Sequence, residues 1–214
     1  MLIESLFFII ILLFSVIIHE VAHGTIANYL GDPTAKDNGR LTLNPINHLD
    51  PIGSVFLPLF LVIVQSPIFI GWAKPVPVNP YNLKNPKKDM AKISVAGPTV
   101  NFAVALFFSL IIHFFSIPEN LLAIFSIIIF INILLAVFNL MPIPPLDGSK
   151  ILFSFLPSKF EYVQIWMEQF SLFLFLGFVF LLINGIIPLI QIVFLIFYFV
   201  AGPEATQALF QLLS

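Results

Sequence analysis

The sequence contains no cysteine, so it can form neither a disulfide nor a thiolate metal site. Any metal ion would have to be bound by histidine, aspartate or glutamate side chains. Charge is scarce as well, because 9% of the 214 residues are charged, against roughly 25% in an average soluble domain. So few charged groups cannot cover the exterior of a water-soluble globule, and that class is excluded.

A cationic surface is also lacking. The nine Lys and Arg residues form no basic run, and the formal net charge is -2. This excludes a nucleic-acid partner, which would need a clustered basic face. What the chain has instead is 59% hydrophobic residues, so we expect an integral membrane protein whose main surroundings are the lipid bilayer.

Uncharged stretches of about 20 residues can cross the hydrocarbon core as helices. We expect such helices over residues 2–30, 93–118 and 120–146. A signal peptide over the first stretch is opposed by two facts: it has no positive residue before the apolar run, and no small-residue cleavage site follows. Residues 169–203 are interrupted near Asn184, which predicts either two short helices in a hairpin or one span plus a surface helix.

Residues 51–73 are uncharged but contain Pro58 and Pro67, so a re-entrant segment is favoured over one straight helix. The predicted fold is therefore all-α: a polytopic transmembrane bundle with a re-entrant segment, forming a single integral-membrane domain over residues 1–214. A short membrane-associated β-strand is a further possibility, because residues 40–44 alternate polar and apolar side chains before Pro45. An ordinary interfacial loop would explain that stretch equally well.

Basic residues predict the orientation, because Lys and Arg accumulate on the cytoplasmic side of membranes. All nine lie in three places, after the first helix, before residue 93 and after the helix that ends near residue 146. If all three places are cytoplasmic, the three helices alternate correctly, provided that residues 51–73 enter and leave on one side. We therefore expect a multi-pass protein of the cell membrane.

His19, Glu20 and His23 form an H-E-x-x-H sequence on the first predicted helix. Histidines four residues apart share one helix face and can bind one metal ion together. Zinc suits neutral imidazole and carboxylate ligands, and a catalytic site keeps one of its four positions for water. A third protein ligand is then required, and Asp147 stands out just beyond an otherwise uncharged span.

Depth in the membrane supports this grouping. At about 1.5 Å per residue, His23 lies roughly 10 Å from the end of its helix, nearer the cytoplasmic face. Asp147 follows its span at the same face, where three prolines interrupt the helix. The alternative is a metal-free proton relay or a structural polar cluster. Metal binding is favoured because it offsets the cost of placing ionisable residues at membrane depth.

The chain resembles the site-2 protease family of intramembrane zinc metalloproteases, because it has several motifs similar to those of the family in the same order. The resemblance rests on residues 19–23, on the small-residue-and-Asn stretch at 96–101, and on the Asn...Pro-x-Pro-Pro-Leu-Asp-Gly stretch at 139–148. Residues 39–45 and 71–77 are similar to the short bacterial and archaeal members. Residues 1–214 hold no PDZ domain or CBS pair, which many members carry.

The resemblance implies that His19, His23 and Asp147 ligate Zn²⁺ and that Glu20 is the general base. It also implies that Asn139 and Asn101 bind the substrate backbone or an oxyanion. The alternative for both asparagines is interhelical hydrogen bonding. His48 and His113 are expected to be interfacial polar residues away from the metal.

The implied function is hydrolysis of peptide bonds within or near transmembrane helices of membrane-protein substrates, as in regulated intramembrane proteolysis. Two other functions stay open. A cation transporter would also bury ionisable residues, although no internal repeat is visible. A catalytically silent scaffold would normally have lost a ligand or the base. Nothing in the sequence specifies an oligomeric state.

Overall fold

A computed structural model describes residues 2–56, 60, 63–64 and 73–213. Helices account for nearly all of the regular structure. The longer ones are α1 (Leu2–Tyr29), α4 (Pro86–Phe114), α5 (Glu119–Asn139), α8 (Ser171–Ile183) and α9 (Leu189–Leu213). Shorter ones are α2 (Thr34–Asp37), α6 (Asp147–Phe155), α7 (Glu161–Gln169), η1 (Pro45–His48), η2 (Pro51–Phe56), η3 (Pro80–Asn82) and η4 (Ser158–Phe160).

Four helices in the described part of the chain are long and apolar enough to cross a membrane: α1, α4, α5 and α9. A fifth span is possible if η4, α7 and α8 act as one segment, which is bent by 72° between α7 and α8. These findings confirm the expected multi-pass helical membrane protein. Large apolar side chains stay on its surface, such as Phe107 and Phe199, as expected for helices that face lipid.

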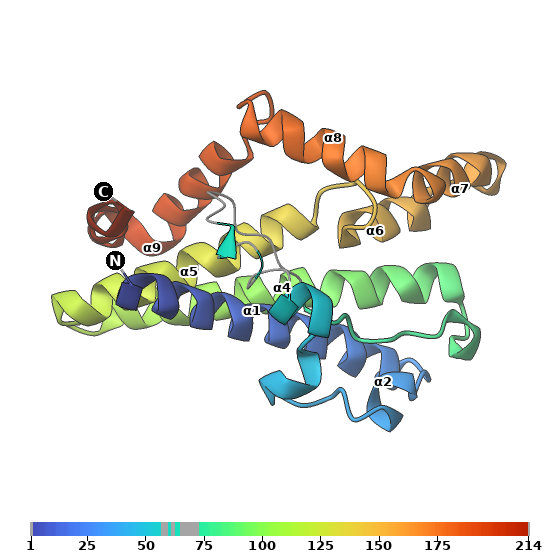
Figure 1. Cartoon of the computed structure of the whole chain (residues 1–214), viewed down its shortest axis with the longest axis horizontal. Helices are drawn as coiled ribbons and strands as arrows, with labels where there is room; N and C mark the ends of the chain where they lie inside the picture. The colour runs from blue at the N-terminus through green and yellow to red at the C-terminus, as the bar shows by residue number, and fades with distance from the viewer. Residues whose placement is uncertain (1, 57–59, 61–62, 65–72, 214) are drawn as a thin grey trace.

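The helices that carry the candidate site residues lie side by side. In Figure 1, α1, α4 and α5 run along one another, and α4 contacts α1, α5 and α6. α9 packs against α5 on the other side and contributes Val193 and Phe197 to the main apolar core. This arrangement places one face of α4 directly against α1.

The helix ends follow local rules. α4 begins seven residues before the predicted residue 93, with Pro86 in its first turn and the Asp89 carboxylate accepting from the Asn85 N–H at 2.9 Å. The charged residues before residue 93 are therefore part of the helix, although they lie outside its apolar part. α5 ends at Asn139, seven residues before the predicted residue 146, because prolines follow.

The predicted interruption of residues 169–203 is confirmed, since α8 ends at Ile183 and α9 begins at Leu189. α9 continues beyond Pro203 and changes direction at Gly202, whose φ of 84° is a left-handed conformation that favours glycine. Most of residues 57–72, on which the re-entrant prediction depends, lie outside the described residues.

The predicted β-strand at residues 40–44 is wrong. Leu41 and Thr42 form a bend, the other three residues have no regular structure, and no strand occurs in the parts of the chain that the structure describes. The backbone groups are used locally: the Asn44 N–H bonds the Thr42 hydroxyl at 3.2 Å, and the Asn44 side chain caps η1. The Thr42 carbonyl accepts from His48 at 2.8 Å. Local bonds of this kind compete with a strand ladder.

Candidate active site

One turn of α1 carries His19, Glu20 and His23, as the H-E-x-x-H spacing predicts. Asp147 is the first residue of α6, at the point where the chain turns back after α5. Gly148 permits this turn, because a Cβ there would lie 2.2 Å from the Leu140 carbonyl oxygen. The start of α6 can thus pack tightly against the end of α5, and this brings Asp147 to α1.

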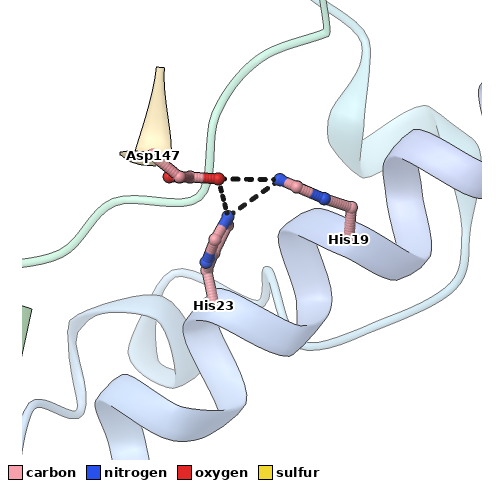
Figure 2. A group of neighbouring side chains, drawn as sticks. All are labelled: His19, His23 and Asp147. Carbon is pink, nitrogen blue, oxygen red and sulfur yellow. Dashed lines mark hydrogen bonds and ion pairs between the residues drawn. The ribbon is translucent and has the colours of Figure 1, made fainter. Parts of the chain in front are cut away.

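His19, His23 and Asp147 converge on one point (Figure 2). The Nε2 atoms of the two histidines are 3.0 Å apart, and each lies 3.1 Å from Oδ2 of Asp147. All three residues are buried. The predicted grouping of these three side chains is therefore confirmed as geometry.

The other ring nitrogen of His23 identifies the tautomer. Its Nδ1 lies 2.7 Å from the Ile93 carbonyl oxygen, which can only accept a hydrogen bond. Nδ1 must therefore carry the proton. In the neutral imidazole this leaves Nε2 as a bare acceptor that faces the cluster.

His19 is oriented in the same way by two buried asparagines. The Asn132 amide donates to the Ile128 carbonyl at 2.9 Å, so its oxygen faces Asn101 and accepts from that amide at 2.8 Å. Asn101 also donates to the Ser15 carbonyl at 3.2 Å, which leaves its oxygen 2.6 Å from Nδ1 of His19. Nδ1 donates there, so Nε2 of His19 is also a bare acceptor.

With both imidazoles neutral, three acceptor atoms therefore face one another, an arrangement that a cation would stabilise. The separations suit zinc, since neighbouring donors of a tetrahedral site with bonds of about 2.0–2.1 Å are about 3.3 Å apart. Hydrogen bonds to the outer nitrogens of histidine ligands are typical of such sites. The residues present thus fit a zinc ion.

Gly97 of α4 provides the room. A Cβ at this position would lie 2.5 Å from Nε2 of His19 and 2.6 Å from Nε2 of His23. Any side chain here would occupy the space at the converging donor atoms. This explains why a glycine of the 96–101 stretch faces the two histidines.

Glu20 is half-buried beside this cluster, and its carboxylate is not among the atoms that converge there. Its Oε2 accepts a hydrogen bond from the Val76 backbone N–H at 2.7 Å. Lys150 approaches the cluster from outside, with its Nζ 3.7 Å from Oδ1 of Asp147. The site thus has a second carboxylate, Glu20, that lies next to the candidate metal ligands and is not one of them.

The two asparagines expected to bind substrate are placed differently. Asn101 lies behind His19, and its amide donates to Ser15 and Asn132. Asn139 is half-buried near the end of α5, and its amide donates to the Leu135 carbonyl at 2.9 Å. Contact of both asparagines with substrate stays a prediction. Asn101 also orients the His19 imidazole, a role that the sequence did not predict.

His48 and His113 lie outside the three-residue cluster, as expected. Nε2 of His48 bonds the Thr42 carbonyl and Nδ1 of His113 bonds the Ser109 carbonyl, each at 2.8 Å. The sequence analysis missed Asn132, which completes the support of His19. Its only signal was a polar side chain in a mostly apolar helix.

Comparison with known proteins agrees with this geometry. The model of Peptidase family M50 matches residues 115–184, which include the stretch with Asp147. "Putative zinc metalloprotease YwhC" of Bacillus subtilis (strain 168) is 38% identical over 179 residues, covering 79% of this chain and 78% of that protein. Rip2 of Mycobacterium tuberculosis (strain ATCC 25618 / H37Rv), which has the same description, is 30% identical over 178 residues, covering 82% of this chain and 65% of Rip2.

A third relative, "Zinc metalloprotease MJ0392" of Methanocaldococcus jannaschii, is 33% identical over 81 residues, covering 38% of this chain and 24% of that protein. No solved structure matches the chain significantly.

The apolar spanning helices and the His-His-Asp cluster, together with the family match and the relatives described as zinc metalloproteases, place the chain in the class of membrane-embedded zinc metalloproteases. More closely, the chain belongs to peptidase family M50, the site-2 proteases, as the match to YwhC over most of both chains shows.

Proposed function

We propose that this protease cleaves transmembrane helices of other membrane proteins, within or near the bilayer of the cell membrane. His19, His23 and Asp147 hold the zinc ion, and Glu20 is the general base. The observation that supports this assignment is the convergence of three acceptor atoms beside the Glu20 carboxylate, at the depth of the spanning helices. A role in regulated intramembrane proteolysis follows from that substrate class.

The residues divide the chemistry between them. When bound, zinc lowers the pKa of water and polarises the scissile carbonyl. The Glu20 carboxylate accepts a proton from the attacking water and passes it to the departing amide nitrogen. Oε2 of Glu20 is engaged by Val76, so Oε1 is the atom we assign to this proton transfer. Asn101 and Ile93 keep both histidines in the ligating tautomer.

The surroundings of the site favour an apolar substrate. A groove of about 660 Å³ runs between α1 and α4, next to the turn that carries the metal ligands. Its walls are almost wholly apolar and include Val21, Ala22, Val95 and Ala96. A segment from a membrane helix would bury apolar side chains there. It must first open, because a helical backbone has its carbonyls satisfied, so helix-weakening residues near the cut are favoured.

We further propose that the active site lies nearer the cytoplasmic face. Support comes from the basic residues at the end of the bundle where α1 ends and α4 begins, including Lys36 and Lys87. Asp147 and Lys150 belong to α6, whose C-terminal end lies beside the start of α4, since the Lys87 ammonium donates to the Leu156 carbonyl. The transporter alternative is not favoured, because the family and its named relatives are metalloproteases.

A purified-enzyme assay tests the proposed function. The substrate is a single-span reporter with one Gly-Pro pair in the cytoplasmic half of a poly-Leu helix. We expect cleavage that stops on adding a zinc chelator and returns with Zn²⁺, and no cleavage by Glu20→Gln. A matched reporter with the pair in the outer half should be cut at least several-fold more slowly. Cleavage by Glu20→Gln at the wild-type rate would refute the assignment of the base.

A further inference from the structure

Residues 73–79 form an extended segment that crosses α1 beside the active site, and we call this segment the strap. Its first part is held by Arg40, whose guanidinium donates to the Lys74 carbonyl at 2.6 Å. Its last part is held by Asp32, whose carboxylate accepts from the Asn79 N–H at 2.7 Å. The strap is therefore fixed at both ends by buried charged side chains.

Asp32 is suited to this anchoring role. Burial on its own would raise the pKa of the Asp32 carboxyl, but hydrogen bonds from Thr34, Asn82 and Asn79 outweigh burial and hold the pKa below its usual range. The group is thus an anion at neutral pH and accepts all of these bonds. The end of α1 and the strap are joined through it.

The middle of the strap contacts Glu20. The Val76 N–H donates to Oε2 of Glu20 at 2.7 Å. Prolines occupy positions 75 and 77 and have no N–H, so Val76 supplies the only backbone donor among these three residues. The prolines also restrict the backbone to an extended conformation. The sequence thus presents one fixed donor to one carboxylate oxygen.

Gly24 explains how the strap approaches α1 so closely. Gly24 lies one turn after Glu20 on the same helix face. A Cβ at Gly24 would lie 2.8 Å from the Val76 side chain and 2.6 Å from that of Leu41. The Val76 side chain itself is buried at this contact.

We propose that the strap is a positioning element for the general base, acting through the Val76 N–H. A charge-assisted hydrogen bond from a fixed backbone group holds the Glu20 carboxylate in one orientation and directs its second oxygen towards the reacting groups. Preorganisation of this kind avoids reorganising the base during the reaction. The proposal rests on the proposed function, and its first test does not require activity.

The first test is amide hydrogen exchange of the full-length protein in detergent, followed by mass spectrometry of a peptide that covers the strap. Pro75 and Pro77 have no amide hydrogen, so residues 75–79 contribute the signals of Val76, Val78 and Asn79. We expect Glu20→Ala to accelerate exchange at Val76 by about 10-fold or more, since a bond to a charged group is lost. Asn79 is the internal control and should stay protected through Asp32. Unchanged exchange at Val76 would overturn the proposal.

The second test is kinetic and uses Val76→Pro, which removes the N–H and keeps an extended backbone. We expect kcat on the reporter to fall by about 10-fold or more, with KM and zinc content close to wild type. Val78→Pro is the matched comparison, because it places the same ring two residues away and keeps the Val76 N–H, so its kcat should fall less than that of Val76→Pro.

Other outcomes of the kinetic test contradict a positioning role. An unchanged kcat, or a rise in KM alone, would show that the strap does not act on the base. A rise in kcat would mean that the strap inhibits the enzyme, which also overturns the proposal. If Val76→Pro loses zinc or fails to fold, the exchange measurement decides. Absence of cleavage by the wild-type enzyme would refute the proposed function and leave the exchange result valid.

Discussion

At the scale of single residues, the tautomer of His19 is determined by a chain of amide groups that begins at a backbone carbonyl. Ile128 orients Asn132, Asn132 orients Asn101, and Asn101 orients the imidazole. Asn132, Asn101 and His19 are buried among apolar helices, where an unsatisfied polar group is costly. The direction of each hydrogen bond is therefore strongly preferred.

This chain predicts that Asn132→Leu weakens zinc binding although Asn132 does not contact the metal site. Without its amide, Asn101 loses one fixed partner and His19 loses its enforced tautomer. We expect a fall in zinc affinity of about 10–100-fold, measured by competition with a chelator. Ser126→Ala on the same helix is the control, since this buried hydroxyl bonds the Leu122 carbonyl of its own helix. Equal affinity of Asn132→Leu and wild type would remove Asn132 from the site.

At this scale the motif residues were predictable, but the groups that hydrogen-bond to them were not. His19, Glu20 and His23 follow from helical spacing, and Asp147 follows from being a carboxylate at the end of an apolar span. Asn132 carries no such signal, because one asparagine in a membrane helix fits many interhelical hydrogen bonds. The Val76 contact with Glu20 involves a backbone group, which side-chain patterns do not report.

At the scale of elements, hydropathy predicted the long helices, and their ends were less accurate. The helix predicted from residue 93 begins at Pro86, because hydropathy marks the apolar part of a helix and charged first turns lie outside it. The strand predicted at residues 40–44 was wrong, since a five-residue alternation is too short to distinguish a strand from a loop with local hydrogen bonds. Neither error affects the position of α1.

The contact between α1 and α4 gives a second prediction. Gly97→Ala should lower zinc occupancy to a small fraction of wild type, because the new methyl group would lie within 2.6 Å of both histidine Nε2 atoms. Gly177→Ala on α8 is the matched control, as a Cβ there meets nothing within 4 Å and should leave zinc content unchanged. Metal analysis of the purified proteins would compare the two. Full zinc occupancy in Gly97→Ala would contradict the close packing of α4 on the metal site.

At the scale of the whole molecule, composition predicted an integral membrane protein, and the uncharged stretches predicted that it is helical and multi-pass. The packing order of the helices was not predictable, because α1, α4, α5 and α9 are all apolar and differ little in pattern. The strap is also a property of the whole molecule, since residues 32, 40 and 20 hold it from three places in the chain.

Orientation is tested by cysteine labelling, which is simple because the chain has no native cysteine. Lys36→Cys and Lys87→Cys flank residues 51–73 and should both react with an impermeant reagent from the cytoplasmic side only. Glu119→Cys, at the start of α5, should react from the opposite side. Labelling of Lys87→Cys from outside would show that residues 51–73 cross the membrane, and would overturn the proposed side of the active site.

The most direct test of the account is the zinc content of the purified protein and its site variants, measured by elemental analysis. We expect about one zinc ion per chain in the wild type and in Glu20→Gln, which keeps every ligand and loses the base. Asp147→Ala, and likewise His19→Ala or His23→Ala, should lose most of the zinc. Full zinc in Asp147→Ala, or loss of zinc in Glu20→Gln, would contradict the assignment of the ligands and of the base.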